Sequence, residues 1–248
     1  KDYTPPAFLI DTVDLDFVIE TGGTTVTATL AMCRNPAVAA QPLVLDGDEL
    51  SLSELRLDQN EMPAAQFDVT PDSLVIRDLP ESTPFEITVV TMINPEANTQ
   101  LMGLYRSNGI YCTQCEAEGF RKITYFQDRP DVMARYRVTL RALKADYPVL
   151  LSNGNLIAKE DLADGWHNAI WEDPFPKPSY LFALVAGKLV CLEDVITSCS
   201  GNKKLLQIWV EPRDLHKTHH AMDSLKRSIV WDEKRFGLEL DLERFMIV

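Results

Sequence analysis

The sequence lacks any long apolar run, and it is short of positive charge. Its longest apolar stretches, such as residues 181–187, fall far below the ~18–20 apolar residues that a membrane-spanning helix needs. Lysine and arginine number 24 against 37 aspartates and glutamates, which gives a formal net charge of -13. Such a chain is repelled by the phosphates of nucleic acids and of anionic membranes. We therefore expect a soluble protein that binds neither nucleic acid nor a membrane.

Cysteine is also scarce, and its distribution excludes a disulfide scaffold. The five cysteines are Cys33, Cys112, Cys115, Cys191 and Cys199. Small secreted proteins instead carry a dense, even-numbered set. The chain opens on Lys1 with neither an initiating methionine nor a signal-peptide pattern, so its start reads as trimmed or internal. We expect a cytoplasmic location.

Alternating apolar residues dominate the first hundred positions. Residues 13–19 and 26–32 each alternate apolar with mostly polar positions, and Gly22 and Gly23 lie between them. Two period-2 runs around a glycine pair predict a β-hairpin. Further short apolar runs follow, separated by Asp, Asn, Gly and Pro. The pattern predicts a mainly β fold.

Three prolines interrupt this pattern at Pro174, Pro176 and Pro178. Proline has no amide hydrogen for a strand ladder, so we expect residues 173–178 to form an extended connector outside any central strand. An apolar strand should follow at residues 180–186.

The pattern changes after Gly187. Two strands are expected at residues 195–198 and 205–210, followed by a helix at about 215–236. Met222, Leu225 and Ile229 have i, i+3, i+7 spacing, Asp214 is a candidate N-cap, and Gly237 is a candidate C-cap.

These changes predict two domains, residues 1–187 and 188–248. The sequence ends in the apolar run 245–248, without a turn or a polar tail. We therefore expect the chain to be a fragment of a longer protein.

Two motifs have the spacing of metal ligands. Cys112 and Cys115 form a CxxC motif, but no second Cys or His pair accompanies it, and its flanks are β-type rather than helical. His216 and His220 lie one helical turn apart, yet Lys217 occupies the position where a catalytic HExxH motif has glutamate. We favour packing cysteines and a polar helix face, and zinc or redox chemistry at the CxxC motif stays an alternative.

An acidic cluster in the middle of the chain is the remaining candidate for chemistry. Its members are Glu116, Glu118, Asp128 and Asp131, with Arg121 and Arg129 among them. Paired carboxylates can act as general acid and base, although a loop of mixed charge is more often salt-bridged or solvated surface. The residues alone leave both interpretations open.

Several long strings nevertheless resemble the bacterial aminopeptidase N family. They are YCTQCEAEGFR at 111–121, ITYF at 123–126, DRPDV at 128–132, LLSNGN at 150–155, WEDPFPKP at 171–178, YLFALVAG at 180–187 and WDEKRFG at 231–237. The resemblance extends over essentially the whole chain, from Asp2 to Val248.

The resemblance implies a zinc-dependent aminopeptidase that removes N-terminal residues from peptides. It also implies a saddle-shaped β-sheet N-terminal domain, followed by the first strands and helix of a thermolysin-like α+β catalytic domain. The family's HExxH and Gly-Ala-Met-Glu-Asn motifs do not occur in this sequence. We therefore expect the chain to bind no zinc and to be inactive alone, because metal-assisted hydrolysis needs the ion that acidifies the attacking water. Its partners would be peptides with free N-termini and the remainder of the same polypeptide.

The resemblance also assigns two substrate-binding residues. The family's Gln-x-Glu motif corresponds to Gln114 and Glu116, so Glu116 would accept hydrogen bonds from the substrate's α-ammonium while Gln114 shapes the pocket. Glu118 is a rival for the role of Glu116, because residues 114, 116 and 118 would share one face of a strand. The other interpretation of Glu118 is a salt bridge to a nearby arginine.

Two expectations complete the sequence analysis. Asp128 and Arg129, followed by Pro130, are expected to form a turn in which the aspartate bonds nearby backbone donors. The alternative to the aminopeptidase is a non-catalytic, β-rich module that binds peptides or proteins.

Overall fold

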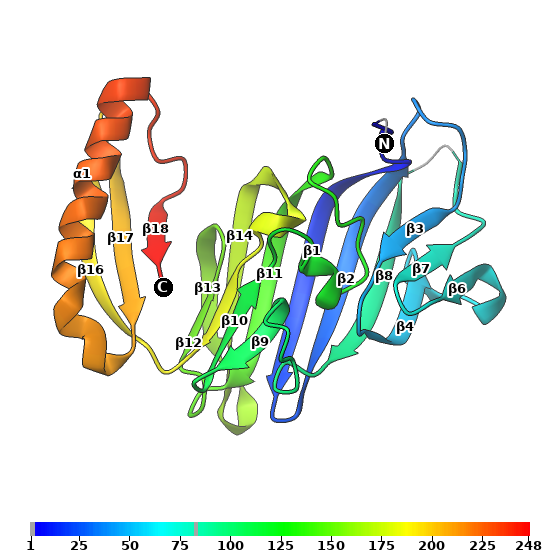
Figure 1. The fold of residues 1–248 in the computed structure, drawn as a ribbon, viewed down its shortest axis with the longest axis horizontal. Helices are drawn as coiled ribbons and strands as arrows, with labels where there is room; N and C mark the ends of the chain where they lie inside the picture. Colours follow the sequence, from blue (N-terminus) through cyan, green and yellow to red (C-terminus); the bar gives the residue numbers. More distant parts are fainter. Residues whose placement is uncertain (1–2, 82–83) are drawn as a thin grey trace. The chain divides into compact units, whose positions relative to one another are not determined.

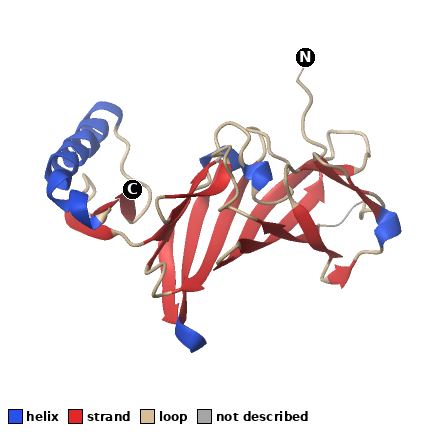
Figure 2. Ribbon diagram, turned by 60° about the horizontal axis from the view of Figure 1, so that its bottom comes forward, coloured by secondary structure: helices blue, strands red, loops and turns tan. Residues whose placement is uncertain are grey.

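The computed structural model describes residues 3–81 and 84–248. The chain forms two compact units that divide between Gly187 and Lys188, called unit 1 and unit 2 here. Strands make up most of the regular structure (Figures 1 and 2), so the prediction of a mainly β fold is confirmed. Lys1 and Asp2, on which the expected trimmed start falls, lie outside the described residues.

Within the described residues, the largest sheet of unit 1 has eight strands. In sheet order they are β13 (Asn155–Asp161), β14 (Trp166–Pro178), β11 (Met133–Leu143), β1 (Phe8–Glu20), β2 (Gly23–Arg34), β8 (Phe85–Ile93), β4 (Ser51–Leu57) and β5 (Asn60–Glu61). The antiparallel pair β1 and β2 confirms the predicted hairpin, and its turn contains Gly22 at φ 84°. On its other side β1 pairs in parallel with β11.

Smaller sheets and short 3₁₀ helices complete unit 1. One sheet consists of β12 (Val149–Ser152), β15 (Leu184–Gly187), β10 (Ile110–Gln114) and β9 (Gly103–Ser107). Another consists of β3 (Leu43–Asp46), β7 (Ser73–Ile76) and β6 (Phe67–Val69). The 3₁₀ helices of unit 1 are η1 (Ala64–Gln66), η2 (Phe120–Lys122), η3 (Ala163–Gly165) and η4 (Ser179–Leu181).

The proline segment departs from expectation. Residues 173–178 are the last part of β14, not a connector, and they pair with β11. The prolines are tolerated because β13 pairs with β14 only as far as Glu172, so among the described strands this end of β14 has a neighbour on one side only. Residues 174–176 also bulge opposite Arg135 in the register of the two strands. The apolar strand expected at 180–186 is shorter, because η4 precedes β15.

Unit 2 contains the sheet β16 (Val190–Thr197), β17 (Lys203–Val210) and β18 (Arg244–Ile247), with η5 (Pro212–Lys217) and α1 (Thr218–Phe236). Met222, Leu225 and Ile229 are buried against the sheet residues Leu206 and Ile208, which confirms the apolar face predicted for the helix. In the part of the chain that the structure describes, no helix is both long and apolar enough to cross a bilayer.

The ends of the helix differ in how well they were predicted. Gly237 is left-handed at φ 68° and donates its N–H to Glu233 O, so the C-cap is confirmed. Asp214 is not the N-cap, because Pro212 begins η5 and α1 starts only at Thr218. The Asp214 carboxylate instead pairs with Lys217.

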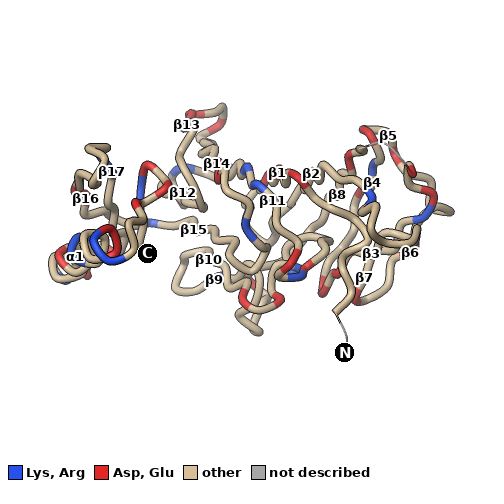
Figure 3. The backbone as a smooth tube through the Cα atoms, turned by 90° about the horizontal axis from the view of Figure 1, so that it is seen from above, with Lys and Arg blue, Asp and Glu red and all other residues tan. Residues whose placement is uncertain are grey.

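The outer face of the long sheet is polar. Arg141 of β11 lies 2.7 Å from Asp16 of β1, and Arg135 lies 2.7 Å from Asp11. Figure 3 shows basic and acidic residues close together along these two strands. All four side chains are at least partly exposed, so each pair contributes at most about 1 kcal/mol.

The inner face of the sheet packs on an aromatic cluster. Phe120 of η2 lies at its centre, with ring centroids 5.0 Å from Phe126, 5.3 Å from Phe182 and 6.2 Å from Tyr136. Phe182 also stacks on Phe17 of β1 at 5.9 Å. All five rings are buried, and Phe120 is 0% exposed. The cluster therefore fixes η2 to the sheet.

We predict that Phe120→Ala lowers the free energy of unfolding of unit 1 by about 3–5 kcal/mol, since it leaves a cavity at the centre of the cluster. Urea denaturation followed by circular dichroism measures the change. The matched control is Phe175→Ala at a residue that is 46% exposed, and it should cost about 1 kcal/mol or less. Equal losses in the two variants would contradict this description of the core.

Candidate functional site

The two residues expected to bind substrate lie at the end of a strand. Gln114 is the last residue of β10, and Glu116 lies in the turn that follows, residues 115–119, which we call the 115–119 turn. Both side chains are exposed, and Gln114 Nε2 donates to Glu116 O at 3.0 Å. The peptide bond between Glu116 and Ala117 is cis. Among the described residues, the Glu116 carboxylate has no hydrogen-bond or ion-pair partner.

Glu118 differs from Glu116 in its contacts. The shared strand face expected for residues 114, 116 and 118 is wrong, because β10 ends at Gln114 and both glutamates lie in the turn. Glu118 Oε1 lies 3.4 Å from Arg121 Nη2. The salt bridge considered for Glu118 is therefore confirmed, and of these two glutamates Glu116 is the one whose carboxylate has no partner among the described residues.

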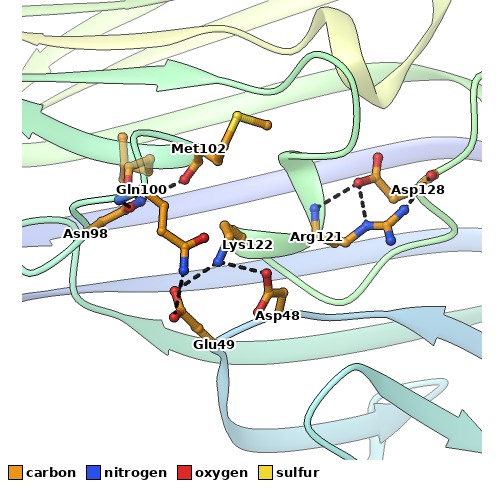
Figure 4. A network of polar contacts seen from close by, with 9 residues as sticks. Asp48, Glu49, Asn98, Gln100, Met102, Arg121, Lys122 and Asp128 are labelled. Carbon is orange, nitrogen blue, oxygen red and sulfur yellow. Dashed lines mark hydrogen bonds and ion pairs between the residues drawn. The ribbon is translucent and has the colours of Figure 1, made fainter.

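The three residues after the turn anchor it in different directions. Phe120 enters the aromatic cluster. Arg121 pairs with Asp128, and Lys122 pairs with the loop between β3 and β4 (Figure 4). Because these anchors are consecutive in the chain, the backbone that leaves the turn is held on several sides at once.

Asp128 is the most buried charged residue of this group, with a side chain 1% exposed. Its Oδ2 accepts the backbone N–H and the Nε–H of Arg121, both at 3.1 Å. Its Oδ1 accepts the hydroxyl of Ser179 at 2.5 Å. The expected turn at Pro130 is present, but the Asp128 carboxylate reaches Arg121 and Ser179 instead of capping that turn.

Lys122 makes the second electrostatic anchor. Its side chain is 7% exposed, and its Nζ lies 2.7 Å from Asp48 Oδ2 and 2.9 Å from Glu49 Oε2. Burial lowers the pKa of Lys122, but the hydrogen bonds to the two carboxylates outweigh it and leave the pKa raised, so the lysine stays charged. Gln100 Nε2 donates to the other oxygen of Glu49 at 3.1 Å (Figure 4).

The turn also depends on close backbone packing. The Gly119 N–H donates to Cys115 O at 2.7 Å, which closes the turn. A Cβ on Gly119 would lie 2.3 Å from Gln114 O and 3.0 Å from the backbone nitrogen of Gly103. Glycine is needed here because the chain passes too close to β9 and β10 for any side chain.

In the described part of the chain, the two motifs with the spacing of metal ligands do not form a metal-binding site. Among the described residues, the five cysteines form no disulfide bond, and Cys115 of the CxxC motif is buried. Burial raises the pKa of the Cys115 thiol, which keeps it protonated and a poor metal ligand. In residues 3–81 and 84–248, no group of three or more His, Cys, Asp or Glu side chains lies together in a way that could hold a metal ion.

Comparison with known families gives a match over most of the chain. The Peptidase M1 N-terminal domain family matches residues 11–181. This stretch contains Gln114, Glu116 and every anchor of the 115–119 turn described above.

Individual relatives are similar along the full chain. Aminopeptidase N of Caulobacter vibrioides and that of Escherichia coli are each 47% identical over 247 residues, which is 100% of this chain and 28% of the relative. The crystal structure of Legionella pneumophila aminopeptidase A in complex with aspartic acid superposes with a TM-score of 0.94 at 38% identity, over 99% of this chain and 29% of that one. The chain thus spans less than a third of the length of these relatives.

We predict that Gly119→Ala lowers the free energy of unfolding by about 1–3 kcal/mol, because the added methyl group must displace the backbone of β10 or β9. Urea denaturation tests this. The control is Gly23→Ala, where the nearest atom to a new Cβ is Ile93 O at 3.8 Å, an ordinary contact. If both variants were as stable as the parent chain, the close packing of the turn would be refuted.

Proposed function

The chain belongs to the Peptidase M1 N-terminal domain family, and on this premise we propose that it is the N-terminal part of a zinc-dependent aminopeptidase in which it binds the free α-amine of a peptide. The observation that carries the proposal is the carboxylate of Glu116, which is exposed and has no partner among the described residues. The turn that bears it is followed by residues that form ion pairs with the rest of unit 1. A free carboxylate on a fixed backbone is available to a ligand at little cost in ordering.

Glu116 supplies the electrostatic part of this recognition. A peptide's N-terminal ammonium carries a positive charge and three N–H donors, so it forms charge-assisted hydrogen bonds with a carboxylate. An acylated N-terminus has neither the charge nor those donors. A site built around Glu116 therefore selects chains that begin with a free amine, which is the requirement of an exopeptidase.

Gln114 has a supporting role in the same site. Its Nε2 is already bonded to the backbone of Glu116, which helps to fix that residue. We propose that the exposed Gln114 side chain shapes the pocket for the first residue of the peptide.

The remaining parts of the enzyme would lie elsewhere in a longer polypeptide. We propose residues 1–187 as the N-terminal β-domain and residues 188–248 as the start of the catalytic domain. The described residues of this chain do not fit a zinc site, so zinc would be held by other residues of that polypeptide. The 248-residue chain is expected to be inactive alone, and the whole protein to act in the cytoplasm.

We predict that Glu116→Gln, in the full-length protein that contains this chain, raises the KM for free-amine peptide substrates by about 10- to 100-fold, because the neutral amide lacks the charge that strengthens a hydrogen bond from an ammonium. The value of kcat should change much less, because the ammonium is bound in both the ground state and the transition state. Steady-state kinetics with an amino-acid anilide measures both constants.

The matched control is Glu118→Gln, which removes the same charge from a neighbouring residue of the same turn. Because Glu118 is engaged by Arg121, its substitution should leave KM within about twofold of wild type. A KM unchanged by Glu116→Gln would remove that residue from the site. A larger effect at Glu118 would transfer the role to it.

A further inference from the structure

We propose that Asp128 is a positioning residue for Glu116, holding the 115–119 turn through Arg121 so that the Glu116 carboxylate meets the substrate amine. This inference rests on the proposed function. Among the described contacts, Asp128 makes no hydrogen bond or ion pair with Glu116 or with the 115–119 turn, and we expect its effect on Glu116 to pass through Arg121.

The first argument is that the hydrogen-bonding groups of Asp128 are all engaged. Its two carboxylate oxygens accept from Arg121 and from Ser179, and its backbone carbonyl accepts from Arg121 Nη2 at 3.1 Å. Its own N–H donates to Asp46 Oδ2 at 3.0 Å. A residue bonded on every side in the interior has a single well-defined position.

The second argument is that Arg121 transmits this position to the backbone. Asp128 binds both the main-chain N–H and the side chain of Arg121, while Arg121 O accepts the N–H of Asp48 at 3.0 Å. At the other end, Gln114 pairs with Gly103 in the strand ladder. Residues 115–120 are thus a short bridge between two fixed points, and Glu116 lies within it.

The third argument is that two other carboxylates compete with Asp128 for the guanidinium of Arg121. The guanidinium lies 4.0 Å from Asp46 Oδ2 and 3.4 Å from Glu118 Oε1 as well as 3.1 Å from Asp128. If Asp128 lost its charge, the guanidinium would be drawn towards these other two carboxylates. That movement would pull on the Arg121 backbone and on the turn that precedes it.

The fourth argument concerns burial. The carboxylates that hold Lys122 are 46% and 61% exposed, whereas Asp128 is 1% exposed. Ion pairs in water are weak, while removal of one partner of a buried pair is strongly disruptive. Among the anchors in Figure 4, the Asp128–Arg121 pair is therefore the one expected to control the position of the turn.

The test is Asp128→Asn in the full-length enzyme, which keeps the shape of the side chain but removes its charge. We expect KM for a free-amine anilide to rise about tenfold with kcat changed less than about threefold, because a displacement of ~1 Å is enough to weaken an oriented contact. A loss of folded enzyme alone would lower apparent kcat and leave KM unchanged, which would overturn the proposal.

A double-mutant cycle with Glu116→Gln identifies the route of the effect. If Asp128 acts through Glu116, Asp128→Asn should change KM by less than about twofold in the Glu116→Gln background. Independent, multiplicative effects would overturn the proposal while leaving the role of Glu116 intact. If Glu116→Gln alone has no effect, the proposed function fails instead, and the two failures are thereby distinguished.

Two further variants keep the test decisive. Asp16→Asn removes the same charge from a partly exposed ion pair with Arg141 on the outer face of the sheet, and it should leave KM unchanged. If Asp128→Asn does not yield folded enzyme, the test uses Ser179→Ala, which removes only the hydroxyl that donates to Asp128 Oδ1. Because this variant loses one buried hydrogen bond to Asp128, its KM should rise about two- to threefold. An unchanged KM in Ser179→Ala enzyme, with Asp128→Asn unfolded, would count as refutation.

Discussion

A carboxylate that is shut off from water must find its hydrogen bonds inside the protein, and Asp128 finds them at Arg121 and Ser179. These two partners come from η2 and η4, so one buried charge joins two distant segments, and Ser179 lies 51 residues from Asp128 in the chain. The aromatic cluster provides the apolar surroundings, since Phe120 precedes Arg121 directly. The position of the 115–119 turn follows from these contacts.

The arrangement separates the residues that give stability from the residue that is left for a ligand. The core buries Phe120, and ion pairs hold Arg121 and Lys122. The carboxylate of Glu116, in contrast, is exposed. A loop that carries a binding group on a rigid support loses little entropy when the ligand arrives. The same logic explains why Gly119 has no side chain, because the turn must lie against β9 and β10.

Sequence patterns predicted the local features and missed the long-range ones. Period-2 alternation identified the β1–β2 hairpin, and Gly237 marked the helix end, because both depend on neighbouring residues. The prolines of β14 were misjudged, since their tolerance depends on where β13 stops. Gln114 and Glu116 came from the family resemblance alone. No pattern joins Lys122 to Glu49, 73 residues away, or Asp128 to Ser179, because those contacts exist only after folding.

The most direct measurement of the central claim compares two ligands that differ only in the amine. A peptide with a free N-terminus and its desamino analogue would compete for binding to the full-length protein, with and without Glu116→Gln. We predict that the wild-type protein prefers the free amine by about 10- to 100-fold and that the substitution removes most of this preference. An identical preference in both proteins would contradict the account, because the amine would then be recognised without Glu116.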